Sequence, residues 1–448
     1  MDPVTAIFVI GTLLGVAGCG SSGPSSRPDR EEQDPPDGGS DLSADGPEPL
    51  PVDGGDGGMI GADAEADAMP PRREKINDRW AEFEDCVLAD LVLADEKLYA
   101  LCEGNPHRLV QCDPADEDLE PAACDDFVLF EDLPHLDGKP LEIAPLVHNV
   151  LNDRYSVVTF TSVPDNYPGF FVVDRTTREI TDQRAWEAPG IRVGSDIIEF
   201  PSNLPWGSAL LGDNLLIAAR NRDFETAGEN YYGGMFLYFD WNGDGTVGIP
   251  EEAELGVAFR FTNGLNPTLF RPDGSTAKLL NNQHRGGASP LSSGWDRIAL
   301  DGDGRPVIDE DDFQSLGAIS FEPFKHFAAS PDGSAVFLAS RPNLYVYQPA
   351  AHSLSDPYPW EDERVISAAW GGALGDRVFF AGESQAVFSA SISDGGAVFA
   401  SGGISLIGEP TASAIDLSQG IYYQGLIVDA AAGQSAITAM LDSIFDVE

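Results

Sequence analysis

The stretch Lys325–Pro349 constrains the fold most, because it contains three short apolar runs separated by tight turns. The runs are His326–Ala329, Ala335–Ala339 and Leu344–Tyr347, and the first turn contains Pro331-Asp332-Gly333. Proline fixes φ at the second turn position, and glycine tolerates the left-handed conformation that leads back into a strand. The stretch therefore predicts an antiparallel meander, which is too small to bury a core without further copies of itself.

Similar units recur along the chain, and each ends an apolar run in Asp or another polar turn residue. The endings are Asp113, Asp174, Asp240, Asp301, Gln348, Asp394 and Asp429. They lie 61, 66, 61, 47, 46 and 35 residues apart, and these spacings centre near the length of about 40–50 residues typical of a four-stranded propeller blade. We therefore predict an all-β fold, a β-propeller of about seven four-stranded blades over residues 75–448. A pair of β-sandwiches or a β-helix is the structural alternative.

The Pro-Asp-Gly turns at Arg271–Ser275 and Ser330–Ser334 resemble those of TolB-type and YncE-type β-propellers. Asn266-Pro267-Thr268, just before the first of these units, also resembles the YncE-type pattern. The resemblance extends over Trp80–Glu448 and implies the propeller fold. The recurrent Trp-Asp endings of another propeller family are missing from the sequence.

The chain of 448 residues carries a formal net charge of −48, from 74 acidic and 26 basic residues. Residues 20–74 contain 14 acidic and 4 basic residues, a net charge of −10, so −38 remains on the rest of the chain. Lysine is scarce, and this composition predicts a protein adapted to salt, which screens the self-repulsion of the folded state. An ordinary acidic protein is the alternative. Nucleic-acid binding is not expected, because no basic stripe offsets this field.

The N-terminus has the layout of a signal peptide. The apolar run Ala6–Gly18 is too short to span a bilayer comfortably. It ends in Val16-Ala17-Gly18-Cys19, which resembles the bacterial lipobox and implies cleavage after residue 18 and lipidation of Cys19. Gly20 follows the cysteine, and by the same resemblance it favours the outer membrane or cell surface as the location. The alternative is a simple signal peptide with a chance cysteine.

Residues 19–74 form an acidic linker rich in Gly, Pro, Ser, Asp and Ala. Such a segment cannot bury enough apolar surface to offset its ordering entropy, and its like charges extend it. We expect a disordered tether that holds the following domain away from the membrane.

Four further cysteines, Cys86, Cys102, Cys112 and Cys124, lie close together in the sequence. In an exported chain an even number of cysteines predicts two disulfides. Three pairings are open, and one of them joins Cys102 to Cys112 across a hairpin and leaves Cys86 with Cys124. A metal site is the alternative, but no close Cys-x-x-Cys pair is present.

The segment Asp240–Glu251 reads DWNGDGTVGIPE and satisfies the pattern of a calcium loop. The candidate ligands are Asp240, Asn242, Asp244, the backbone carbonyl of Thr246, and Glu251. Calcium takes six to eight oxygen ligands, and Gly245 permits the sharp bend that directs alternate side chains inward. The loop resembles those of EF-hands and dockerins, although a strand rather than a helix precedes it. A metal-free hairpin turn is the alternative.

A second acidic loop, Asp301–Asp312, matches this pattern less well, because Ala299 stands at the first ligand position. Here we expect an acidic turn. The polar run Asn281–Gly287 contains His284 and Arg285, which are candidate contacts for an anionic ligand. Ordinary loop polarity is the favoured explanation of the run.

No HExxH motif and no GxSxG motif occurs in the sequence. We therefore expect a non-enzymatic binding or scaffold module, anchored to the membrane by lipid, with a protein, glycan or small molecule as its ligand. The alternative is a calcium-dependent propeller hydrolase acting on esters, lactones or phosphoesters, in which acidic ligands hold a metal with an open position for water. A purely structural surface protein is a third alternative.

Overall fold

The computed structural model describes residues 75–445 with gaps. The gaps are residues 105, 131–141, 164–167, 186–190, 194–195, 199–204, 220–223, 227–228, 232–234, 254–257, 262–263, 271–276, 285–292, 318–326, 331–333, 341–342, 352, 361–363, 372–375, 394–395 and 400–402. The predicted signal peptide, Cys19 and the predicted linker therefore lie outside the described residues.

The described residues form seven antiparallel sheets of four or five strands, which we number in chain order. Sheet 1 contains β2 (Val87–Ala94), β3 (Lys97–Glu103), β4 (Arg108–Cys112) and β5 (Cys124–Leu129). Sheet 2 contains β6 (Glu142–Val150), β7 (Tyr155–Val163), β8 (Pro168–Asp174) and β9 (Glu179–Ala185). Sheet 3 contains β12 (Pro205–Leu211), β13 (Asn214–Ala219), β16 (Met235–Trp241), β17 (Val247–Gly248) and β18 (Ala258–Phe261).

The remaining sheets follow the same order along the chain. Sheet 4 contains β19 (Gly264–Phe270), β20 (Ala277–His284), β21 (Ser293–Leu300) and β22 (Pro306–Gly317). Sheet 5 contains β23 (Phe327–Ala329), β24 (Val336–Ser340), β25 (Asn343–Gln348), β26 (Ser353–Leu354) and β27 (Tyr358–Pro359). Sheet 6 contains β28 (Val365–Gly371), β29 (Arg377–Gly382), β30 (Ala386–Ser393), β31 (Gly396–Phe399) and β32 (Ile404–Ser405). Sheet 7 contains β33 (Glu409–Asp416), β34 (Ile421–Asp429), β35 (Gln434–Leu441) and β1 (Ile76–Phe83).

Three smaller features complete the described structure. Two hairpins stand apart from the seven sheets: β10 (Ile191–Val193) with β11 (Asp196–Ile198), and β14 (Phe224–Thr226) with β15 (Glu229–Tyr231). A short 3-10 helix, η2 (Asp442–Phe445), follows β35. Helical structure in the described part of the chain offers no candidate for a membrane-spanning segment. The predicted all-β class is therefore confirmed.

The predicted meander is present as β23, β24 and β25 of sheet 5. Its first turn is closed by Ser330, whose N–H donates to the Ala335 carbonyl at 2.8 Å. The Ala335 N–H in turn donates to Ser330 Oγ at 2.9 Å. Serine at the strand end thus supplies both hydrogen bonds that bring the chain back into β24.

Most of the predicted repeat endings fall at the same place in their sheets, the end of the third strand. Six of the seven, from Asp113 to Asp394, lie at or next to the end of the third strand of sheets 1–6. The seventh, Asp429, ends β34, which is the second strand of sheet 7, so its assignment was wrong. Asp442, directly after β35, takes the equivalent place. The last interval is therefore 442 − 394 = 48 residues rather than 35.

Aspartate suits the strand ends because its carboxylate accepts hydrogen bonds from the turn that follows. Asp174 Oδ1 accepts the N–H groups of Thr176 at 2.8 Å and Thr177 at 3.2 Å. A hydrogen bond from Arg154 to the same carboxylate stabilises its charged form, so the pKa of Asp174 lies below its usual value. Asp301 Oδ1 likewise accepts the N–H groups of Asp303 and Arg305, so turn formation explains the aspartates at these two strand ends.

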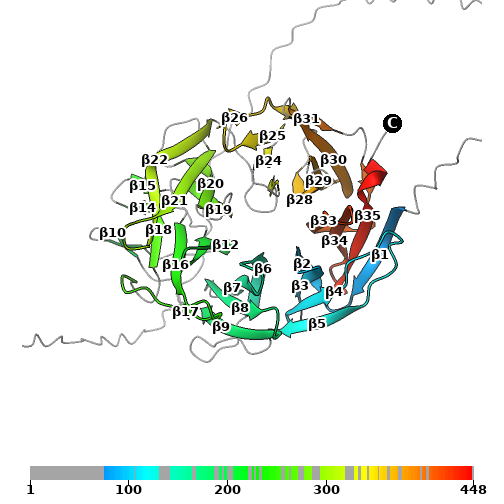
Figure 1. Ribbon diagram of the computed structural model, residues 1–448, viewed down its shortest axis with the longest axis horizontal. Helices are drawn as coiled ribbons and strands as arrows, with labels where there is room; N and C mark the ends of the chain where they lie inside the picture. The colour runs from blue at the N-terminus through cyan, green and yellow to red at the C-terminus, as the bar shows by residue number, and fades with distance from the viewer. Residues whose placement is uncertain are drawn as a thin grey trace, which may run out of the picture. The chain divides into compact units, whose positions relative to one another are not determined.

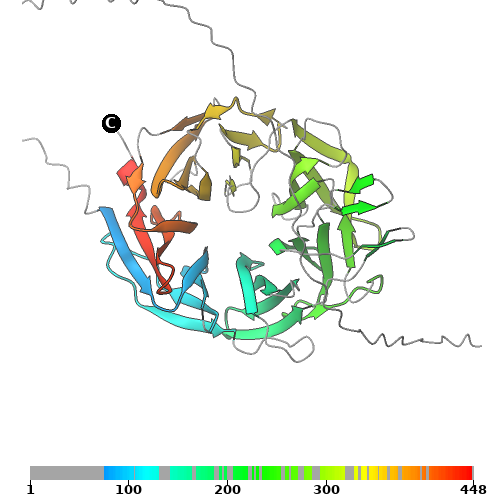
Figure 2. The same cartoon turned by 180° about the vertical axis from the view of Figure 1, so that it is seen from behind.

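Seven clusters of buried side chains form the core, and each draws its members from two neighbouring sheets. Strand β8 illustrates the pattern, since Phe170 and Val172 pack toward sheet 3 and Phe171 and Val173 pack toward sheet 1. Successive side chains of a strand point to opposite faces, so a strand buried on both faces appears as a continuous apolar run. The clusters link sheets 1 to 7 in order and then sheet 7 to sheet 1, as the ring in Figures 1 and 2 shows.

Sheet 7 joins the beginning and the end of the described chain. Strand β1 pairs antiparallel with β35, from Ile76 opposite Met440 to Phe83 opposite Ser435. Trp80 on β1 is buried, and its ring centroid lies 5.1 Å from that of Tyr423 on β34. The blue and red ends of the ribbon therefore meet in one sheet in Figure 1.

Candidate functional site

The loop Asp240–Glu251, which the sequence predicts to bind calcium, begins as a β-hairpin between β16 and β17. Asp240 pairs with Gly248 across the hairpin. At its tip the Asn242 N–H donates to the Thr246 carbonyl at 3.2 Å, and Asn242 Nδ2 donates to Thr246 Oγ1 at 2.9 Å. Asn, Asp and Gly favour such turns, so the residues that match a calcium loop also satisfy a hairpin.

The two aspartates of the hairpin have protein partners. Asp244 Oδ1 accepts hydrogen bonds from Thr246 Oγ1 at 2.6 Å and from the Thr246 N–H at 3.0 Å. These bonds stabilise the carboxylate and lower the pKa of Asp244. Asp240 forms an ion pair with Arg305, which raises the pKa of the Arg305 guanidinium. Arg305 Nε also lies 3.2 Å from Glu252 Oε1.

A tyrosine and a second arginine extend this network. Tyr238 Oη donates to Glu252 Oε1 at 2.9 Å, and the guanidinium carbon of Arg260 lies 4.9 Å from the centre of the Tyr238 ring. Burial raises the pKa of Tyr238 to about 12, so its hydroxyl remains a donor at neutral pH. Because Arg305 comes from the turn between β21 and β22, the network joins sheet 3 to sheet 4.

The tip of the hairpin also contacts sheet 2 through strand β9. Thr181 Oγ1 donates to the Gly245 carbonyl at 2.8 Å, and the Val247 N–H donates to Asp182 Oδ2 at 2.7 Å. Arg184 Nη2 donates to the Val247 carbonyl at 2.5 Å. The hairpin is therefore a junction between three successive sheets.

The hairpin does not gather its predicted ligands around one point. Asp240 and Asp244 bond to protein groups, as does Asn242, and Glu251 is exposed. Within the described ranges no group of three or more His, Cys, Asp or Glu side chains lies close enough to hold a metal ion. Calcium binding stays a prediction, and it requires Asp240 to exchange Arg305 for the ion.

The second candidate site falls mostly outside the described residues. His284 is the last residue of β20, and its backbone pairs with Gly264 of β19. Arg285 and the side chain of His284 are not among the described groups. Their contact with an anionic ligand therefore stays a prediction.

A pocket of about 520 Å³ opens between the outer strands of sheets 1 and 2. It is lined by Leu129, Phe130, Phe171, Ile180, Thr181, Asp182 and Gln183. Thr181 and Asp182 both bond to the hairpin of sheet 3. The polar groups of these two lining residues are therefore already used in holding the hairpin. The described lining of the pocket supplies no free pair of acid and base groups.

Two buried polar residues lie between sheets 1 and 2, and the sequence did not single them out. His148 on β6 is 3% exposed, and neither ring nitrogen has a hydrogen-bond partner. Burial lowers the pKa of His148 to about 3, so the ring is neutral at pH 7. Arg175, which directly follows β8, lies 2.8 Å from Asp95 Oδ2 through Nε and donates to the Tyr155 carbonyl at 2.8 Å. A lone histidine or arginine beside an apolar run gives no signal of such a site.

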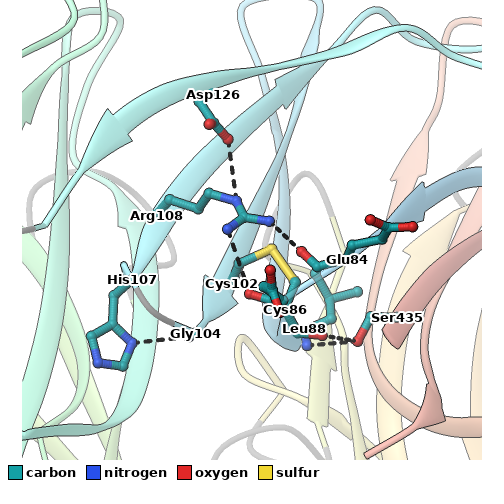
Figure 3. Close-up of a disulfide and its surroundings, with 10 residues drawn as sticks. Glu84, Cys86, Leu88, Cys102, Gly104, His107, Arg108, Asp126 and Ser435 are labelled. Carbon is teal, nitrogen blue, oxygen red and sulfur yellow. Dashed lines mark hydrogen bonds and ion pairs between the residues drawn. A yellow bond between two sulfur atoms is a disulfide. The ribbon is translucent and has the colours of Figure 1, made fainter. Parts of the chain in front are cut away.

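The four cysteines form two disulfides, as predicted, but not in the hairpin pairing considered above. Cys86 is bonded to Cys102, and Cys112 to Cys124 (Figure 3 shows the first). In the register of β3 and β4, Cys102 lies opposite Arg108 and Cys112 opposite Leu98. Cys102 and Cys112 are thus offset by four residues, or about 13 Å, which is too far for a disulfide.

Comparisons with known proteins add a structural likeness. No family model matches the chain, and no curated protein matches it. Among solved structures, a chain of hydrazine synthase from Kuenenia stuttgartiensis is similar, with a TM-score of 0.47 and 11% identity. The match covers 78% of this chain and 94% of that chain. At this TM-score the likeness carries no argument about fold or function.

Proposed function

We propose that residues 75–448 form a seven-bladed β-propeller that acts as a non-enzymatic binding or scaffold module. The observation that carries the proposal is the arrangement of seven sheets with one buried cluster between each neighbouring pair. Because the apolar faces of the strands are used in packing sheet against sheet, the loops at the strand ends remain for recognition. A ring held in this way is a rigid support for such loops.

The location of the module follows from the N-terminal sequence. We propose that Cys19 carries lipid and that residues 19–74 are a tether, which places the propeller at the outer membrane or cell surface. Two disulfides suit an oxidising compartment. In a membrane fractionation of cells expressing the full chain, the wild-type protein is expected with the membranes. The Cys19→Ser variant is expected in the soluble fraction, and an unchanged distribution would contradict the anchor.

Calcium belongs to this proposal as a stabilising ion at Asp240–Glu251. The support is the sequence match together with the position of the hairpin between sheets 2, 3 and 4. An ion that binds only the folded state at such a junction stabilises it by an amount that grows with the ratio of free calcium to Kd.

The test of function separates binding from turnover. The full chain is applied to a glycan array and, separately, to a panel of ester, lactone and phosphoester substrates. Saturable binding to one glycan class without turnover supports the proposal, and the variants His284→Ala and Arg285→Ala show whether the polar run takes part. Turnover that disappears on chelation would replace the proposal with a calcium-dependent hydrolase.

A further inference from the structure

The crossing from sheet 7 to sheet 1 is held by hydrogen bonds to Gly433, just before β35, and to the hydroxyl of Ser435 on β35 (Figure 3 shows those of Ser435). After β1 the chain runs through Glu84 and Asp85 to Cys86, just before β2. The Cys86 N–H donates to the Gly433 carbonyl at 2.8 Å. Ser435 Oγ on β35 donates to the Cys86 carbonyl at 2.8 Å and accepts the Leu88 N–H at 3.1 Å.

The same crossing is tied to sheet 1 from the other side. Cys86 is joined to Cys102 on β3, and both residues are fully buried. Arg108 on β4 donates through Nη2 to the Glu84 carbonyl at 2.6 Å and forms an ion pair with Asp126. Cys86 is therefore the point where the last sheet, the first sheet and the connection between them meet.

The start of β2 is the weak part of this connection. Two of its residues, Val87 and Leu88, pair with β3 before the register is interrupted between Leu88 and Asp90. If β1 separates from β35, further opening toward the irregularity is opposed by these two pairs, by the hydrogen bonds of the crossing to Gly433, Ser435 and Arg108, and by the disulfide. The disulfide is the one covalent link among them, so without it separation of β1 passes more easily into β2.

We propose that the Cys86–Cys102 disulfide is a redox-sensitive lock on the closure of the ring. While it is intact, separation of β1 from β35 stops at residue 86. In the oxidised chain β1 remains attached to a fixed point on sheet 1, so its pairing with β35 is favoured by a high effective concentration. In the reduced chain that point is lost, and sheet 7 opens more readily. These contacts hold the crossing whatever the ring binds.

The chemistry of unlocking is thiol–disulfide exchange with a dithiol. One thiolate of the dithiol attacks a protein sulfur, the S–S bond breaks, and a mixed disulfide forms. The second thiol then displaces the remaining protein sulfur, which leaves two cysteine thiols and an oxidised cyclic dithiol. Both sulfurs of Cys86–Cys102 lie in buried residues, whereas Cys124 of the second disulfide is partly exposed. Cys112–Cys124 is therefore reduced first.

The test compares two matched variants of the full chain by hydrogen exchange and mass spectrometry. In Cys86→Ala/Cys102→Ala we expect exchange in Ile76–Phe83 to be at least tenfold faster, while sheets 5 and 6 keep their wild-type protection. Cys112→Ala/Cys124→Ala removes the same atoms from the same sheet, and β1 is expected to keep its protection. Equal effects of the two variants on β1, or none from the first, would overturn the proposal.

A second measurement covers the case in which the first variant does not fold. The wild-type protein is treated with dithiothreitol, and samples are pulse-labelled with deuterium and mapped for free thiols over time. Protection of β1 is expected to persist after Cys112–Cys124 is reduced and to fall with reduction of Cys86–Cys102. Loss of β1 protection when only Cys112–Cys124 is reduced would refute the lock, as would retention of β1 protection after both disulfides are reduced.

Discussion

His148 shows how a single buried group makes stability depend on pH. Its ring is enclosed between sheets 1 and 2, 5.8 Å from the ring of Tyr99 and under the influence of the positive charge of Arg175. Burial and then this charge lower its pKa in the folded chain to about 3, from an ordinary value of 6.5. The unfolded chain therefore binds a proton below pH 6.5 that the folded chain does not bind until about pH 3.

We expect the stability that His148 contributes to be complete above pH 6.5 and to decline as pH falls toward 3. At pH 5 the loss is about 2 kcal/mol in the free energy of unfolding. Urea unfolding of wild type and His148→Phe at several pH values measures it, and the variant should have the flatter profile between pH 6.5 and 4. Asp174 acts in a lower window, because its pKa is depressed below 3.8 in the folded chain. Equal slopes for the two proteins would contradict this account.

Two glycines at the tip of the hairpin offer a second test at this scale. Gly245 has φ of +87°, and a Cβ there would lie 2.5 Å from Tyr155 Cε1 and 2.6 Å from Thr181 Oγ1. Gly243 has φ of +78° and nothing within 4 Å of the same position. We expect both alanine variants to be strained, with Gly245→Ala less stable than Gly243→Ala by a further ~1–2 kcal/mol. Thermal unfolding measures the difference. Equal losses of stability in the two variants would mean that Gly245 does not pack closely against sheet 2.

At the scale of elements, the strands of the meander could be predicted because short apolar runs and turn residues are local signals. The disulfide pairing could not, because it depends on the register between strands, which the sequence around Cys102 and Cys112 does not specify. Asp429 gave the wrong position for the last repeat ending for a related reason, since sheet 7 takes its fourth strand from the beginning of the described chain. The calcium pattern of Asp240–Glu251 is ambiguous because hairpin turns and metal loops use the same residue types.

Calcium binding by the hairpin predicts a shift in thermal stability. If calcium binds, it should raise the free energy of unfolding by about 2.7 kcal/mol at a hundredfold excess over Kd. Chelation with EDTA should therefore lower the Tm of the wild-type protein, and excess calcium should restore it. Asp244→Asn should remove this response. Asp303→Asn, in the turn between β21 and β22 that lacks a first ligand, should keep it. A wild-type Tm that is the same with EDTA and with calcium would end the calcium proposal.

At the scale of the whole molecule, charge is the dominant feature. The net charge of −48 is spread beyond the linker, and each like pair raises the free energy of the compact chain. We expect the Tm to rise as sodium chloride is increased from 0.1 to 2 M, most steeply at the lower concentrations, where screening changes most. Sucrose at matched osmolality is the control. A Tm that does not depend on salt would show that the carboxylates are already compensated.

The pairing of β1 with β35 also sets an order of events in time. The contact between Asp78 and Thr438 spans 360 residues, so the first strand made has no partner until the last is present. Closing so long a loop is slow, and the other six sheets form from local contacts beforehand. We therefore expect sheet 7 to be the last of the seven sheets to form. A chain truncated before β35 lacks the strand with which β1 pairs, so its first sheet edge stays open.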